Sequence, residues 1–265
     1  MRYKLMAIDM DGTILDPQKK IRKNTVLAIQ KAIDLGVYFV ISTGRPSQGV
    51  EKYSEISEIA SFIITYNGAV IFSPKEQRVL YEVCLEEKVA LEITHFGKKL
   101  GATMCLWVKN KLYAFELNER VDYYASLSGI KPILINDLKH LVCEGVTKAL
   151  WFDDADVIKE YQKKLKGNLK GNVTYCTSDP CFLEFFSGEA SKGNALRFLE
   201  QHLNVERSKM IAIGDGMNDL TMLEYAGLGI AMDNAPDELK SLADDITLSN
   251  DEDGVVHVIE KYILA

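Results

Sequence analysis

The residues best suited to chemistry follow the first apolar stretch of the chain. Residues 5–8 are apolar and lead directly into Asp9 and Asp11, and Gly12 then lets the chain turn away without steric cost. Residues two apart in an extended strand face the same side, so the spacing predicts both carboxylates on one face. Buried carboxylates need a cation, and Mg²⁺ prefers oxygen ligands. A plain polar turn is equally compatible with this segment alone.

A second pair of carboxylates follows another apolar stretch, expected to be a strand over 210–213. Asp215 and Asp219 lie in the segment GDGMND, at a predicted strand-to-helix turn. The segment is not a dinucleotide fingerprint, because Asp219 stands where the third glycine belongs, and it lacks the Gly-Lys of a P-loop. We expect a second pair of oxygen ligands here. A polar turn in which Asn218 or Asp219 caps the helix is compatible with that role.

Lys192 is expected in the first turn of a helix over 192–203 that Ser191 caps. The helix macrodipole disfavours a cation at this position, so the placement predicts an anion nearby. Thr43 and Arg45 follow an apolar run at 37–41, and the Arg45 guanidinium could grip an oxyanion. Taken singly, Thr43 is also compatible with a strand end, and Arg45 with a surface position.

The order of elements predicts a doubly wound α/β core. Strands are expected over 37–41, 61–65, 210–213, 229–232 and around 245–247, with helices between them, including one from Pro46 to about residue 59. In such sheets ligands bind outside the carboxyl ends of the strands. Asp9, Asp11, Thr43 and Asn67 all fall at such ends, although Asn67 with Gly68 is alone compatible with a simple turn.

From about residue 84 the pattern changes to that of an α+β unit. A helix over 85–99 precedes two strands joined by a turn at Lys109 and Asn110, which predicts antiparallel pairing. Further strands are expected over 146–152, 173–176 and 182–186, with helices over 120–127 and 155–165. We therefore expect a core formed by residues 1–83 and 187–265, and an inserted domain over 84–186.

Composition narrows the classes of protein. The chain has 265 residues, 47% hydrophobic and 26% charged, typical of a globular protein, and its net charge of −7 argues against a nucleic-acid partner. No apolar run is long enough to span a membrane, and Asp9 and Asp11 interrupt any signal peptide. The five cysteines form no C-x-x-C pair, which favours free thiols in a reducing, cytoplasmic setting. The sequence does not fix the oligomeric state.

Four segments together resemble the haloacid dehalogenase superfamily of phosphohydrolases, and more closely its Cof-like sugar phosphatases with a type IIB cap. They are residues 9–13, 42–45, 191–193 and 214–219, each at a predicted strand end or helix start. The segment 67–69 matches as well, and the resemblance covers essentially the whole chain. Between Asp9 and Thr43 there is room only for one loop, one helix and one strand, so the cap must lie between Asn67 and Lys192. The resemblance implies a Rossmann-like core sheet.

The resemblance also implies a mechanism for hydrolysing small phosphorylated metabolites, typically sugar phosphates. Asp9 would attack phosphorus and form an aspartyl-phosphate. Asp11 would protonate the leaving alcohol and then activate water. Thr43 and Lys192 would bind the oxygens of the transferring phosphoryl group.

Mg²⁺ is the cofactor that the resemblance implies. It would sit between Asp9, the backbone carbonyl of Asp11 and Asp215, with Asp219 supporting. The positions assigned to phosphate or substrate are Gly12, Gly44, Arg45, Asn67 and Asn218. Two alternatives stay open: a phosphomutase of the phosphomannomutase kind, and a phosphometabolite-binding regulator without turnover, which the presence of both opening acids disfavours. The sequence does not name the substrate, because cap loops vary freely.

Overall fold

The computed structural model describes residues 2–265, and the chain forms two compact units. The first comprises the residues up to Arg45, Val50–Tyr81 and Ser191–Ala265, and the second comprises Pro46–Gly49 and Glu82–Ala190. The sequence analysis expected the inserted domain over 84–186, a few residues shorter at both ends. No helix within residues 2–265 is long and apolar enough to cross a membrane.

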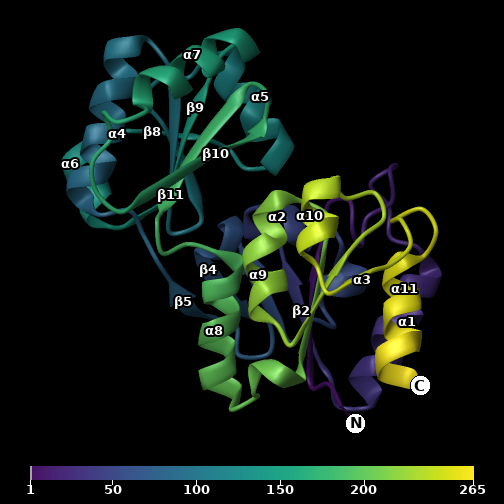
Figure 1. The fold of residues 1–265 in the computed structure, drawn as a ribbon. Coiled ribbons are helices and arrows are strands. Elements are labelled where there is room, and N and C mark those ends of the chain that lie inside the picture. The colour runs from purple at the N-terminus through teal and green to yellow at the C-terminus, as the bar shows by residue number, and fades with distance from the viewer. Residues whose placement is uncertain (1) are drawn as a thin grey trace. The chain divides into compact units, whose positions relative to one another are not determined.

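The first unit is built on an eight-stranded sheet of order β14-β13-β12-β1-β2-β3-β4-β5. Strands β2, β4 and β5 of this sheet are labelled in Figure 1. The strands are β1 (Leu5–Asp9), β2 (Tyr38–Ser42), β3 (Phe62–Thr65), β4 (Val70–Ser73), β5 (Arg78–Glu82), β12 (Met210–Gly214), β13 (Leu228–Ala231) and β14 (Asp245–Ile246). From β14 to β3 all neighbours are parallel, whereas β4 runs antiparallel to β3. The expected doubly wound, mostly parallel α/β core is confirmed.

Strand β1 holds the central place in this topology. Strands β2 and β3, which follow β1 in the sequence, lie on one side of β1, and the later strands β12 to β14 lie on its other side. The strand order therefore reverses at β1, and ligands of such sheets bind at the carboxyl end of the strands where this happens. Asp9 is the last residue of β1.

Helices cover both faces of this sheet, which explains why β1 reads as an unbroken apolar run. Met6 and Ile8 join a buried cluster with α1 (Lys23–Asp34) and α11 (Gly254–Ile259). Leu5 and Ala7 point the other way and pack with α8 (Lys192–Leu203), α9 (Leu220–Tyr225) and α10 (Asp237–Leu242). The strand is thus fixed from both sides, and its last residue has a rigid position.

The second unit contains a six-stranded sheet of order β10-β11-β9-β6-β7-β8. Its strands are β6 (Thr103–Val108), β7 (Lys111–Ala114), β8 (Ile133–Leu134), β9 (Val146–Phe152), β10 (Val173–Asp179) and β11 (Phe182–Ser187). Helices α4 (Glu87–Leu100), α6 (Leu138–Cys143) and α7 (Ala155–Leu165) pack on one face. On the other face, where α5 (Glu119–Ser128) packs, Lys148 donates to Glu184 at 2.8 Å, and both side chains are buried. The unit has the expected α+β character.

Two expectations about elements are corrected. The single helix expected from Pro46 to about residue 59 is instead two short helices, α2 (Ser47–Glu51) and α3 (Ser54–Ser57). The core sheet also continues into β4 and β5, which the sequence analysis did not predict. Strand β5 is largely exposed and lacks the apolar alternation by which a strand is recognised.

Candidate active site

Asp9 lies at the carboxyl end of β1 and Asp11 lies just beyond it, and their side chains have different partners. Strand β1 ends at Asp9, and the chain then turns, with Ile14 N donating to the Asp9 carbonyl at 3.3 Å. Strand β1 therefore does not include Asp11, and the turn that follows the strand sets the position of this side chain. Asp9 contacts Lys192, whereas Asp11 contacts Arg45 and Lys19.

Lys192 is the first residue of α8, and its side chain is completely buried. Ser191 caps the helix as expected, with its hydroxyl accepting from Asn194 N. The Lys192 ammonium donates to Asp9 Oδ1 at 2.6 Å, to Asp219 Oδ1 at 2.5 Å and to the Ser42 carbonyl at 3.0 Å. Three acceptors match the three donors of an ammonium group. These carboxylates are the anions that the position of Lys192 predicted.

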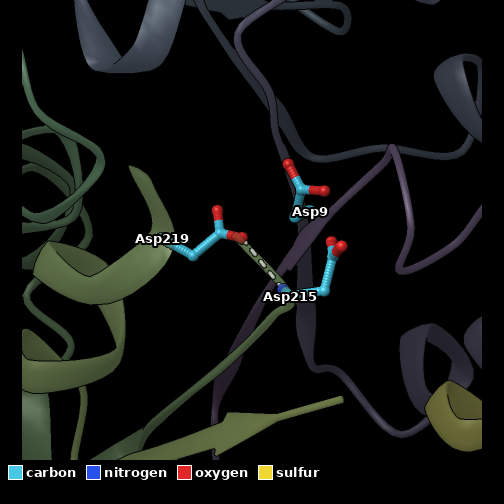
Figure 2. Close-up of side chains that lie close together, drawn as sticks. All are labelled: Asp9, Asp215 and Asp219. Carbon is cyan, nitrogen blue, oxygen red and sulfur yellow. Dashed lines mark hydrogen bonds between the residues drawn. The ribbon is translucent and has the colours of Figure 1, made fainter. Parts of the chain in front are cut away.

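Asp219 connects Lys192 to the loop after β12. While its Oδ1 accepts from Lys192, its Oδ2 accepts from the backbone N–H groups of Asp215 at 3.0 Å and Gly216 at 2.9 Å. Figure 2 shows the hydrogen bond from Asp215 N to Asp219, and it shows how the side chains of Asp9, Asp215 and Asp219 converge from separate segments. Oxygen atoms of these three carboxylates lie within 4.8 Å of one another. The two predicted carboxylate pairs thus meet at one edge of the sheet.

Gly12 allows the loops after β1 and β12 to approach closely. Its φ of +83° is left-handed, and a Cβ at this position would lie 2.2 Å from Asp215 Oδ2. Glycine is therefore required here for two reasons, backbone conformation and space. Thr13 Oγ1 donates to Asp215 Oδ1 at 2.9 Å and fastens the two loops together.

The electrostatics of this cluster suit a divalent cation. Asp9, Asp215 and Asp219 carry three potential negative charges against the single positive charge of Lys192, which leaves an excess of two. Burial raises the pKa of Asp9 well above its ordinary value, against the opposing effect of Lys192. Burial and the charge of Asp219 raise the pKa of Asp215 to about 6. A divalent cation would remove this repulsion, and carboxylate oxygens are the ligands that hard cations prefer.

Asp11 is held by two cations in a more open part of the site. Arg45 contacts both of its oxygens, at 2.6 Å from Nε and 2.7 Å from Nη2, and Lys19 Nζ lies 2.9 Å from Oδ1. Burial alone would raise the pKa of Asp11, but the hydrogen bonds and charges of Arg45 and Lys19 outweigh it and lower the pKa. Planar, two-pronged contact with a carboxylate is the geometry in which a guanidinium also binds phosphate.

The loops after β2 and β3 form another side of the site. Thr43 is buried, and its carbonyl accepts from Asn67 N at 3.1 Å. Asn67 has a left-handed φ of 55°, and its Oδ1 accepts from Asn218 Nδ2 at 3.1 Å. A Cβ on Gly44 would lie 2.8 Å from Asn67 Oδ1, so the Asn67 side chain packs directly against this glycine. All residues that the sequence analysis singled out therefore gather at one edge of the sheet in the first unit.

Sequence reasoning missed three side chains that this edge contains. Lys19 contacts Asp11, and Thr13 contacts Asp215. Asn234 Nδ2 donates to the Gly12 carbonyl at 2.9 Å. Thr13 belongs to the segment 9–13 that carries the family resemblance, but nothing in that segment predicts its contact with Asp215. Lys19 and Asn234 lie in polar loops whose composition resembles that of any surface loop.

Comparison with known proteins identifies the family. A model of the haloacid dehalogenase-like hydrolases matches residues 6–259. Phosphatase YwpJ of Bacillus subtilis (strain 168) is 30% identical over 284 residues, which cover 97% of this chain and 99% of that protein. The 5-amino-6-(5-phospho-D-ribitylamino)uracil phosphatase YcsE of the same organism is 31% identical over 265 residues, which cover 98% and 96%.

Solved structures agree over the same length. A haloacid dehalogenase-like hydrolase from Bacteroides thetaiotaomicron has a TM-score of 0.86 at 30% identity, covering 98% of this chain and 99% of that one. TM0651 from Thermotoga maritima has a TM-score of 0.87 at 30% identity, covering 98% and 97%. The chain therefore belongs to the haloacid dehalogenase-like hydrolases, as a phosphatase of the Cof-like group.

Proposed function

We propose that the protein is a Mg²⁺-dependent phosphatase that hydrolyses small phosphorylated metabolites, in particular sugar phosphates, through an aspartyl-phosphate on Asp9. The observation that carries the proposal is the buried contact of Lys192 with Asp9 and Asp219, set beside the third carboxylate of Asp215. A buried ammonium fixed at the end of β1 holds Asp9 in one orientation and supplies positive charge where a phosphoryl group would be attacked.

The carboxylates of Asp9 and Asp215 and the backbone carbonyl of Asp11 would hold the metal ion, with Asp219 supporting them. When bound, Mg²⁺ supplies charge neutralisation at the phosphoryl oxygens. Both oxygens of Asp219 already accept hydrogen bonds from Lys192 and from backbone N–H groups. We therefore assign Asp219 the task of orienting Lys192 and the Asp215 loop.

In the first half-reaction an Asp9 oxygen attacks phosphorus, and the bond from phosphorus to the leaving oxygen breaks. Asp11 gives a proton to that oxygen, which requires the Arg45 guanidinium to turn from Asp11 toward the arriving phosphate. In the second half-reaction Asp11 takes a proton from water, the water attacks phosphorus, and the Asp9 carboxylate is regenerated. Arg45 and Lys19 favour the ionised form of Asp11 that this second step needs.

The remaining polar groups would bind the phosphate and the substrate. Thr43 and Lys192 would contact the transferring phosphoryl oxygens, with Lys192 exchanging one of its present acceptors for a phosphoryl oxygen. The backbone at Gly12 and Gly44 would line the phosphate position, because the lack of a side chain there lets the neighbouring loops approach. The contact of Asn67 with Asn218 joins two loops at this edge, and together with Arg45 these amides could orient the substrate. The name of the relative YcsE specifies a phosphorylated ribityl group, which supports a sugar-like substrate for this chain.

We further propose that the second unit, expected over 84–186, is a type IIB cap that selects the substrate. A cap of this kind excludes water and adds contacts while the core performs the chemistry. We also propose a cytoplasmic location, which the five free cysteines support because thiols persist in reducing compartments.

The test is a screen of the purified protein against a panel of phosphorylated metabolites, with phosphate release measured in EDTA, Mg²⁺ and Ca²⁺. We expect release from sugar phosphates that EDTA abolishes, Mg²⁺ restores and Ca²⁺ does not, because Ca²⁺ demands a larger coordination shell. Transfer of phosphate between positions of a sugar, dependent on a sugar bisphosphate, would instead identify a phosphomutase. Binding of the panel without any release would identify a regulator.

A further inference from the structure

Two asparagines outside the recognised segments hold the loop that follows Asp11. Asn234 Nδ2 donates to the Gly12 carbonyl at 2.9 Å and reaches Asp215 Oδ2 at 3.5 Å. Asn234 Oδ1 accepts from the backbone N–H of Asn250 at 3.0 Å, and Asn250 Nδ2 donates to the Leu15 carbonyl at 2.7 Å. The two side chains thus donate hydrogen bonds to the loop at residues 12 and 15, and Asn234 also contacts one oxygen of Asp215.

These asparagines come from the loops after β13 and β14, at the edge of the core sheet. Those loops are themselves tied to the strand ends, because Met232 N donates to the Gly214 carbonyl at 3.0 Å and Asp233 N to the Leu248 carbonyl at 3.4 Å. Asn234 is an exposed residue, yet both ends of its amide are hydrogen-bonded. Holding an exposed side chain in one conformation costs conformational entropy, which these contacts must offset.

The Gly12 carbonyl has a particular significance. It belongs to the peptide next to the one that carries the Asp11 carbonyl, and Gly12 lies close to Asp215. A hydrogen bond to this carbonyl therefore fixes the turn between two groups that would bind the metal. Groups that orient metal ligands from outside the coordination sphere commonly affect metal affinity strongly.

We propose that Asn234 is a positioning residue for the metal centre, holding the Gly12 peptide and the Asp215 carboxylate in register, with Asn250 supporting it. The inference rests on the proposed function. Removing the Asn234 amide frees the turn at Gly12 and leaves the Asp215 carboxylate held on one oxygen only, by Thr13. Metal affinity should then fall, because part of the binding free energy is used to order the ligands.

The experiment measures the dissociation constant for Mg²⁺ alone by calorimetry, on the full chain without substrate. We expect Asn234→Ala to weaken Mg²⁺ binding roughly tenfold, at the lower end of the range for such groups. Asn250→Ala should have a smaller effect, because its backbone N–H still contacts Asn234. Asp233→Ala is the matched control, since this exposed neighbour contacts Lys240 and not the loop at Gly12. It should bind Mg²⁺ as the wild type does.

The unfolding midpoint in EDTA separates positioning from general stability. A positioning role predicts an unchanged midpoint in the metal-free variants together with weaker Mg²⁺ binding. Unchanged Mg²⁺ binding in folded Asn234→Ala, or weaker binding with a matching loss of metal-free stability, overturns the inference. Should Asn234→Ala not fold, Asn250→Ala decides by the same two measurements. A wild type that binds Mg²⁺ and releases phosphate upholds the proposed function even when this inference fails, whereas a wild type that does neither overturns both.

Discussion

Replacing Lys192 by Met should destabilise the metal-free protein strongly and slow turnover by orders of magnitude. Lys192 is fully buried and donates to two carboxylates and one carbonyl, and Asp9 and Asp219 are themselves only 5% and 1% exposed. Methionine has a similar volume, so the change removes charge and hydrogen bonds more than packing. Removing one partner of a buried ion pair typically costs about 3–5 kcal/mol, because the remaining charge has no compensation. We expect a loss in this range for Lys192→Met.

The assay is urea unfolding in EDTA at about pH 8, repeated at about pH 5, together with phosphate release. The loss should be smaller at the lower pH, because carboxylates without Lys192 take up protons there. Mg²⁺ should stabilise Lys192→Met more than the wild type, because the cluster then carries a larger excess of negative charge. Turnover should fall by roughly 10²–10³ or more, the effect of removing one electrostatic stabiliser.

Lys148→Met is the matched control for this prediction. Lys148 is also buried and also pairs with a carboxylate, Glu184, but in the second unit. The variant should lose comparable stability, gain nothing extra from Mg²⁺, and retain phosphate release from a small aryl phosphate. The reasoning is refuted if Lys192→Met unfolds within about 0.5 kcal/mol of the wild type in EDTA, the range of a neutral surface change, or if it keeps wild-type turnover.

Three further predictions concern the opening acids, pH and the thiols. Asp11→Asn should show a burst and then slow turnover with an activated aryl phosphate in rapid-quench experiments, because breakdown of the intermediate needs a base; a wild-type steady rate contradicts this role. In EDTA, the unfolding free energy of the wild type should fall relative to that of Asp215→Asn as pH rises from about 4 to about 6. The reason is that Asp215 in the folded protein keeps its proton up to a pKa of about 6, whereas Asp215 in the unfolded chain loses it at lower pH. Parallel pH curves for the two proteins contradict the pKa shift. At about pH 8 iodoacetamide should label Cys143 before Cys105 and Cys176. The pKa of the Cys143 thiol is also raised, but this thiol is exposed, whereas burial raises the pKa of Cys105 and Cys176 to about 12 and about 11; equal labelling rates by mass spectrometry contradict it.

Much of the fold could be predicted because its signals are local. Ser191 and Lys192 mark the start of α8 by cap chemistry, and the structure begins the helix at Lys192. The turn at Lys109 and Asn110 has left-handed φ values of 47° and 59°, and β6 pairs with β7 across it as the spacing predicted. Buried parallel strands such as β1 can also be recognised in the sequence as apolar runs.

The contacts of the site that were not predicted join segments that are distant in the sequence. Asn234 contacts Gly12 across 222 positions, and Arg45 contacts Asp11 across 34. No pattern within a single segment encodes such a pair. The alternation of a strand does not carry over to Asp11, because β1 ends at Asp9 and the chain turns there. Charged loop residues such as Lys19 have no local signal of any kind.

The central claim is that Asp9 carries the phosphoryl group during turnover. The most direct measurement is rapid-quench labelling with a ³²P-labelled substrate in the presence of Mg²⁺, followed by mapping of the labelled peptide. We predict an acid-stable, hydroxylamine-sensitive label on the peptide that contains Asp9, accumulating further in Asp11→Asn and lacking in Asp9→Asn. A label of the same chemistry that persists in Asp9→Asn would contradict the claim.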